Sequence, residues 1–93
     1  MIKTFADKRT AAIFEGLKIR RLDANIQRRA AMKLQQLDAA ITLEDMMTPP
    51  ENRLEVLAGD LKGQSSIRIN QQYRVCFKWE EGNSYDVEFC DYH

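Results

Sequence analysis

Three side chains with complementary chemistry are spaced nineteen residues apart in this chain of 93 residues, namely Glu55, Arg74 and His93. A carboxylate can take the proton from a ribose 2′-OH, and a guanidinium can stabilise the extra charge of a pentacoordinate phosphate. An imidazole can then protonate the departing 5′-oxygen. Together on one patch, they would form a metal-free set that cleaves a phosphodiester. Tyr92 could stack on a base or orient it.

The single histidine is the last residue of the chain and directly follows Asp91 and Tyr92. Its own α-carboxylate, and Asp91 if the carboxylate is near, would favour the charged imidazolium, which is the form that a general acid requires. The alternative interpretation is that terminal residues fray and that these are ordinary surface side chains. Both interpretations stay open on this evidence.

The charge of the chain is zero on average, with 14 basic and 14 acidic side chains, which by itself argues against nucleic-acid binding. Residues 1–33, however, hold nine basic and three acidic side chains, whereas residues 34–93 hold five and eleven. This asymmetry favours an anionic partner. The candidate contacts to RNA phosphates are Lys18, Arg20, Arg21, Arg28, Arg29 and Lys33. Alternatively, these residues form only the solvated side of two helices.

Several classes of protein are disfavoured by composition. No apolar run approaches the roughly 20 residues of a membrane span, and the N-terminus lacks the apolar segment of a signal peptide, so we expect a cytoplasmic protein without a membrane partner. Two cysteines are too few for a disulfide scaffold and are expected to be reduced. One histidine and two widely spaced cysteines do not indicate a zinc site. We predict neither a metal nor a cofactor.

The hydropathy pattern predicts one α+β domain over residues 1–93. An N-terminal strand is expected at 2–5 with two to three helices, of which the first two begin after Asp7 and Asp23, which are good N-caps. Thr42 can cap a further helical turn, with Asp45 three residues later in a capping-box arrangement. The second helix, of about 17 residues, has an apolar stripe at Ile26, Ala30, Leu34, Leu37 and Ile41. From residue 52 onward the period changes to two, with strands expected at 53–57, 66–70, 73–79 and 85–90. The strands should form an antiparallel meander with helices on one face.

The expected register of the meander draws attention to its open face. Three-residue loops at 70–72 and 81–83 would pair Arg68 with Arg74 and Lys78 with Asp86. The second pair is a favourable cross-strand ion pair, whereas like charges placed opposite each other are destabilising. Two neighbouring arginines on a solvated face make sense if an anion lies between them.

The sequence also resembles a known family, the HigB toxins, which are the plasmid-maintenance killer group of the RelE/ParE toxin superfamily. The similarity covers essentially the whole chain, including the aromatic residue before Arg74 and the terminal Asp91-Tyr92-His93. The segments that carry it are MIKTFAD at 1–7, KLQQLDAA at 33–40, NRLEVL at 52–57, GDLKGQ at 59–64, SIRIN at 66–70 and YRVCF at 73–77.

This resemblance implies a compact RelE-like fold and a ribosome-dependent endoribonuclease that cleaves mRNA in the A site. It implies neutralisation by a HigA-type helix-turn-helix antitoxin, with operator DNA bound only through the toxin–antitoxin complex, and contact with 16S rRNA. By position, Arg74, Asp91, Tyr92 and His93 match the family's functional residues, and Arg68 and Lys62 are RNA-facing. Relatives carry either histidine or glutamate where Glu55 stands, which leaves the general base open. Two alternatives remain: a ParE-like toxin acting on DNA gyrase, and an inactive partner that only binds antitoxin.

Overall fold

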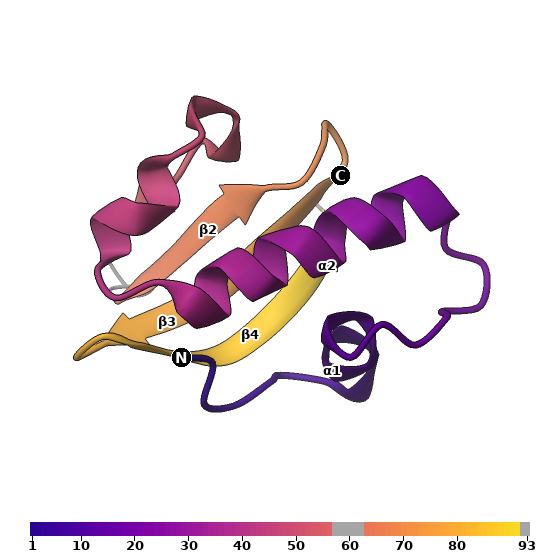
Figure 1. Ribbon diagram of the computed structural model, residues 1–93, viewed down its shortest axis with the longest axis horizontal. Coiled ribbons are helices and arrows are strands. Elements are labelled where there is room, and N and C mark those ends of the chain that lie inside the picture. The colour runs from indigo at the N-terminus through magenta and orange to yellow at the C-terminus, as the bar shows by residue number, and fades with distance from the viewer. Residues whose placement is uncertain (57–62, 92–93) are drawn as a thin grey trace.

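The computed structural model describes residues 1–56 and 63–91. Two α-helices, α1 (Lys8–Phe14) and α2 (Ala24–Ala39), are followed by two short 3₁₀ helices, η1 (Leu43–Met47) and η2 (Pro50–Asn52). The strands β1 (Glu55–Val56), β2 (Gln64–Arg68), β3 (Tyr73–Glu80) and β4 (Asn83–Asp91) form an antiparallel sheet in the order β1-β2-β3-β4. Both α-helices cover the same face of the sheet (Figure 1). The predicted α+β architecture is confirmed, and no helix of the described part is long and apolar enough to cross a membrane.

Both predicted helix N-caps are confirmed. The Asp7 carboxylate accepts a hydrogen bond from the backbone N–H of Thr10 at 2.7 Å, and the Asp23 carboxylate accepts from Asn25 and Ile26 at 2.8 and 3.1 Å. These bonds satisfy backbone donors that have no partner inside the helix. The start of each helix is therefore set by local sequence.

The prediction is wrong for one residue of the apolar stripe of α2. Ala30, Leu34 and Leu37 are fully buried, but Ile41 is 79% exposed. The helix ends at Ala39, and the C-cap residue Ala40 has extended backbone angles (φ −66°, ψ 136°). The periodicity of a helix no longer applies to Ile41, so its side chain leaves the apolar face.

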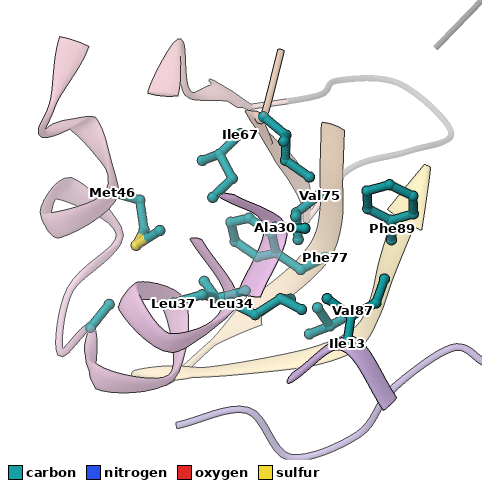
Figure 2. Close-up of a cluster of buried hydrophobic side chains, with 12 residues drawn as sticks. Ile13, Ala30, Leu34, Leu37, Met46, Ile67, Val75, Phe77, Val87 and Phe89 are labelled. Atoms are coloured by element: carbon teal, nitrogen blue, oxygen red, sulfur yellow. The ribbon is translucent and has the colours of Figure 1, made fainter. Parts of the chain in front are cut away.

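The core lies between α2 and the sheet. Figure 2 shows side chains from α1, α2, η1 and three strands meeting there. Phe77 and Phe89 are the largest fully buried side chains, and Tyr73 stacks on Phe89 with ring centroids 4.6 Å apart. Burial of an aliphatic or aromatic side chain contributes about 1.5–3 kcal/mol. The side chains on the helix-facing side of the sheet therefore form the core.

The β2–β3 hairpin has the predicted register, with Ile67 opposite Val75 and Arg68 opposite Arg74. The side-chain oxygen of Asn70 accepts hydrogen bonds from the backbone N–H groups of Gln72 and Tyr73 at 2.9 and 2.8 Å. Such an asparagine closes a turn by replacing a backbone acceptor. The turn is therefore also encoded locally.

The β3–β4 hairpin differs from the prediction. Its turn has two residues rather than three, because Glu81 and Gly82 both adopt positive φ (49° and 81°) and Glu80 pairs with Asn83. This is the backbone of a tight hairpin turn whose twist matches that of the strands. Lys78 consequently pairs with Tyr85 instead of Asp86.

A β-bulge then restores the expected register. The register shifts between Cys76 and Lys78, next to Asp86, whose φ is +51°. Beyond the bulge, Cys76 pairs with Glu88 as predicted. The alternation predicts Tyr85 on the apolar face, but as the partner of Lys78 it lies on the open face. The predicted ion pair survives, since Lys78 Nζ lies 3.5 Å from Asp86 Oδ2.

The predicted first strand is reduced to two parallel bridges on β4. Ile2 pairs with Ser84 and Phe5 pairs with Val87. Residues 1–6 lie along the edge of β4 (Figure 1), and the Lys3 N–H donates to the Ser84 carbonyl at 2.8 Å. The N-terminal segment therefore covers the edge strand that would otherwise expose its backbone.

Candidate functional site

Three of the predicted functional residues lie on the face of the sheet that points away from the helices. Glu55 is the cross-strand partner of Ser66, and Arg74 lies between Arg68 on β2 and Cys90 on β4. Because cross-strand partners project to the same side of a sheet, Glu55, Arg68 and Arg74 share the open face. The predicted convergence of Arg68 with Arg74 is confirmed.

Arg74 is held in place by its hydrogen bonds. Its Nε donates to the Ser66 hydroxyl at 3.0 Å, and its Nη2 donates to the carbonyls of Arg53 at 2.7 Å and Ser66 at 3.3 Å. Only 7% of the residue is exposed. A guanidinium is always charged, and charge-assisted hydrogen bonds are stronger than neutral ones. Arg74 therefore joins β3, β2 and the chain entering β1.

Arg53 is a residue that the sequence pattern misassigns. The pattern predicts the start of a strand there, but Arg53 follows η2 in the left-handed conformation, with φ 44° and ψ 58°. That conformation costs a residue other than glycine about 1 kcal/mol or more, so the surroundings must support it. The hydrogen bond from Arg74 to the Arg53 carbonyl supplies support. The side chain of Arg53 is exposed as a result.

A cleft of about 460 Å³ opens beside Arg53 and is called the arginine cleft below. Its lining residues come from α2, η2, the end of β2 and the β2–β3 turn: Arg29, Pro50, Glu51, Arg53, Arg68, Ile69, Asn70 and Gln71. Three guanidinium groups thus face one carboxylate. The Nε of Arg68 donates to the Asn70 carbonyl at 3.1 Å, which orients that guanidinium. Within residues 1–56 and 63–91, none of the three arginines forms an ion pair.

Buried polar contacts hold η2 against α2. Asn52 is fully buried, and its Nδ2 donates to the carbonyls of Met46 and Thr48 at 3.0 and 3.2 Å and to Gln36 Oε1 at 3.3 Å. Lys33 Nζ donates to Asn52 Oδ1. Burial, aided by the charge of Arg29, lowers the pKa of Lys33. The prediction of Lys33 as a solvated, RNA-facing residue is therefore wrong, because its ammonium is used in a structural contact between α2 and η2. Asn52 determines where the next residue, Arg53, leaves η2.

The other predicted basic residues form a separate surface. Lys18 and Arg28 line a second cleft, of about 330 Å³, together with Gly16, Leu22, Ala24, Gln27 and Ala31; it is called the helix cleft below. Arg20 and Arg21 are exposed in the connection between α1 and α2. Gln27 holds this connection against α2, because its Oε1 accepts from the Ile19 N–H at 3.0 Å and its Nε2 donates to the Leu17 carbonyl.

The C-terminal residues of the predicted set are described only up to Asp91. This residue is exposed, pairs with Tyr73 across the sheet and accepts a hydrogen bond from Gln72 Nε2 at 3.2 Å. Strand alternation places its partner Tyr73 on the helix side, whereas Arg74 lies on the open side. Tyr92, His93 and Lys62 lie outside the described residues.

Two thiols lie beside Arg74 on the open face. Cys76 pairs with Glu88, and Cys90 pairs with Arg74, so the cysteines are diagonal neighbours rather than direct partners, as predicted. Both are free thiols. A hydrogen bond from the Cys90 thiol lowers the pKa of Cys76, with a smaller contribution from the charge of Arg74, while the same bond raises the pKa of Cys90. Cys76 is therefore the more acidic of the two thiols. Among the described residues, no three His, Cys, Asp or Glu side chains group as metal ligands.

Comparison with known proteins supplies the context for this arrangement. The model of a family described as the RelE-like toxin of type II toxin–antitoxin system HigB matches residues 3–93. Toxin HigB-1 of Vibrio cholerae serotype O1 is 43% identical over 83 residues, covering 88% of this chain and 87% of that protein. Endoribonuclease HigB of Proteus vulgaris is 29% identical over 93 residues, covering 100% of both. A YoeB-YefM complex from Staphylococcus aureus aligns with a TM-score of 0.63 at 15% identity, over 100% of this chain and 98% of that chain.

Proposed function

The chain belongs to the family of RelE-like HigB toxins of type II toxin–antitoxin systems, and from that premise we propose that it is an endoribonuclease that cleaves mRNA in the ribosomal A site. The relative from Proteus vulgaris, which aligns with the whole of this chain, is named an endoribonuclease. The observation that supports the proposal most directly is the pairing of Arg68 with Arg74 beside a cleft with three guanidinium groups. Such a concentration of positive charge suits the phosphates of RNA.

In the proposed reaction, a ribose 2′-oxygen attacks the adjacent phosphorus while its proton passes to a base. Glu55 is the candidate for that base, since it lies on the same face as Arg74. The bond from phosphorus to the 5′-oxygen breaks, and His93 gives that oxygen a proton. Arg74 stabilises the charge of the pentacoordinate phosphate. Tyr92 stacks on a base and Asp91 favours the charged form of the histidine.

The proposed partners follow from the same premise. One solved neighbour is a YoeB-YefM toxin-antitoxin complex from Staphylococcus aureus. We expect this chain to be neutralised by a HigA-like helix-turn-helix antitoxin that also carries it to operator DNA. On the ribosome, the exposed basic residues of the helical half would contact phosphates of 16S rRNA. These residues are Lys18, Arg20, Arg21 and Arg28, whereas Arg29 lines the arginine cleft. Arg68 and Lys62 would face the mRNA. Because the proposed partners are the ribosome and its mRNA, we place the protein in the cytoplasm.

The proposal is tested by adding the purified chain to a reconstituted translation reaction and mapping mRNA ends by primer extension. Cleavage in the A site is expected with the wild type and with Lys8→Gln, a charge change on the exposed surface of α1. Deletion of His93 should reduce cleavage at least about a hundredfold, because the leaving oxygen loses its proton donor. Full cleavage by the deletion variant would refute the assignment of His93. Absence of cleavage by the wild type, together with inhibition of gyrase supercoiling, would instead favour a ParE-like toxin.

A further inference from the structure

We propose that the arginine cleft is a binding subsite for one nucleotide of the RNA substrate, next to the nucleotide whose 3′-phosphate is cleaved. In this subsite Arg29, Arg53 and Arg68 bind the phosphodiester, and the amides of Asn70 and Gln71 contact the base. The inference rests on the proposed ribonuclease function and names how the substrate is held. It assigns Arg29 to the mRNA rather than to ribosomal RNA.

The charges that line the cleft favour an anion. Three guanidinium groups from α2, the end of η2 and the end of β2 are opposed by the single carboxylate of Glu51. The charge of Glu51 also partly offsets the lowering of the Lys33 pKa by burial and by Arg29. Within the described part of the chain, Arg29, Arg53 and Arg68 have no carboxylate within ion-pair distance. An arginine fork matches phosphate geometry, and several together bind a phosphodiester strongly.

The size and lining of the cleft fit a nucleotide better than a free anion. A volume of about 460 Å³ lies within the range of sites that hold small organic ligands. Pro50 is exposed and supplies an apolar wall on which a base can lie. The side-chain amide of Asn70 can donate to the edge of the base, and that of Gln71 can donate and accept. Exposed bases of single-stranded RNA are recognised by such contacts to their edges.

The position of the cleft places the bound nucleotide beside Arg74. Arg68 is the cross-strand partner of Arg74, and the Arg53 carbonyl accepts a hydrogen bond from Arg74 at 2.7 Å. Arg53 and Arg68, which line the cleft, are thus both direct neighbours of Arg74, the residue proposed to stabilise the reacting phosphate. Consecutive phosphates of one RNA strand can therefore contact the cleft and the reaction site together.

The test measures binding of a short single-stranded RNA whose riboses carry 2′-O-methyl groups, which prevent cleavage. Fluorescence anisotropy at low salt compares the wild type with the double variant Arg29→Gln/Arg53→Gln. The matched control is Lys3→Gln/Lys8→Gln, which removes the same charge from exposed positions away from the cleft. We expect about tenfold weaker binding for the double variant. The slope of log affinity against log salt should fall by about 0.7 for each phosphate that the variant no longer neutralises. The control should bind within twofold of the wild type.

Three outcomes would overturn the subsite: no saturable binding by the wild type, equal binding by the double variant, or an equal loss in the control. Thermal melts monitored by circular dichroism verify that each variant is folded. Pelleting with vacant ribosomes separates the two sources of RNA, because loss of ribosome affinity with intact oligonucleotide binding would assign the cleft to rRNA and overturn the proposal. Failure of the wild type to cleave mRNA during translation would refute the enzymatic function, whatever the oligonucleotide result.

Discussion

The arginine cleft takes its three guanidinium groups from segments that are far apart in the sequence, whereas the helix cleft takes Lys18 and Arg28 from the continuous stretch 16–31. In the arginine cleft, a hydrogen bond from Arg74 holds the backbone of Arg53, and the Asn70 carbonyl orients the guanidinium of Arg68. In the helix cleft, Lys18 is exposed in the connection before α2, and the exposed Arg28 donates from Nη1 to Asn25 Oδ1 at 3.1 Å within the same helix. Charges that converge through tertiary packing suit recognition of one substrate in a fixed geometry, whereas charges along one continuous stretch of a helix and its connection suit general attraction to an RNA surface.

If the arginine cleft and Arg74 hold the substrate in a fixed geometry, substitution of Arg74 should reduce activity more than any change in the helix cleft. Arg74→Ala removes the proposed charge at the reacting phosphate and the support for Arg53, so mRNA cleavage should fall at least about a hundredfold. Arg74→Lys keeps the charge but not the fork of donors, and should recover only part of the activity. Primer extension on translating ribosomes measures both variants. A fully active Arg74→Ala variant that melts like the wild type would remove Arg74 from the mechanism.

The next largest effect should be on stability. Asn52 holds η2 of the arginine cleft against α2, and Gln27 holds the α1–α2 connection of the helix cleft against α2, so the two side chains can be compared. Asn52→Ala leaves buried carbonyls and Lys33 without their partner and should lower the free energy of unfolding by about 2 kcal/mol. Gln27→Ala removes one partly buried and one exposed hydrogen bond of the α1–α2 connection and should lower the free energy of unfolding by about 1 kcal/mol. Urea unfolding of the two variants provides the comparison. Equal losses would show that both clefts are anchored equally firmly.

The helix cleft should affect ribosome binding more than substrate binding. The double variant Lys18→Gln/Arg28→Gln removes two exposed charges and should weaken pelleting with vacant ribosomes about fivefold, with a smaller dependence on salt. Binding of the 2′-O-methyl RNA should change less than twofold. If oligonucleotide binding fell as much as it does in Arg29→Gln/Arg53→Gln, the two clefts would not have separate roles.

The smallest expected effect concerns the two thiols beside Arg74. The lowered pKa of Cys76 predicts that this thiol is alkylated by iodoacetamide at a lower pH than Cys90, whose pKa is raised. Cys90→Ala removes the thiol that donates to the Cys76 thiolate, so the pKa of Cys76 should rise and its alkylation profile should move to higher pH. Peptide mass spectrometry after timed alkylation measures both rates. A profile for Cys76 that is the same with and without Cys90 would contradict the hydrogen bond.

Much of the fold is predictable because its signals are local. Asp7 and Asp23 begin the helices, and Asn70 closes the β2–β3 turn, each through bonds to backbone groups a few residues away. The prediction for the β3–β4 hairpin is wrong because alternation alone cannot reveal a two-residue turn compensated by a bulge at Asp86. The prediction for Ile41 is wrong because helical periodicity does not show where the helix ends.

The candidate site, too, is predictable from the sequence in part only. Alternation and loop length place Arg68 opposite Arg74, since strand register follows from the apolar pattern of a sheet with one buried face. The charge excess of residues 1–33 and the similarity of the terminal Asp91-Tyr92-His93 to HigB toxins are likewise visible in the sequence. The meeting of Arg29 and Arg53 with Arg68 is not visible there, because it depends on the left-handed turn at Arg53 and on the contacts of Asn52 with α2. Such long-range contacts leave no periodic signal, so the arginine cleft exists only once helix, turn and sheet have packed together.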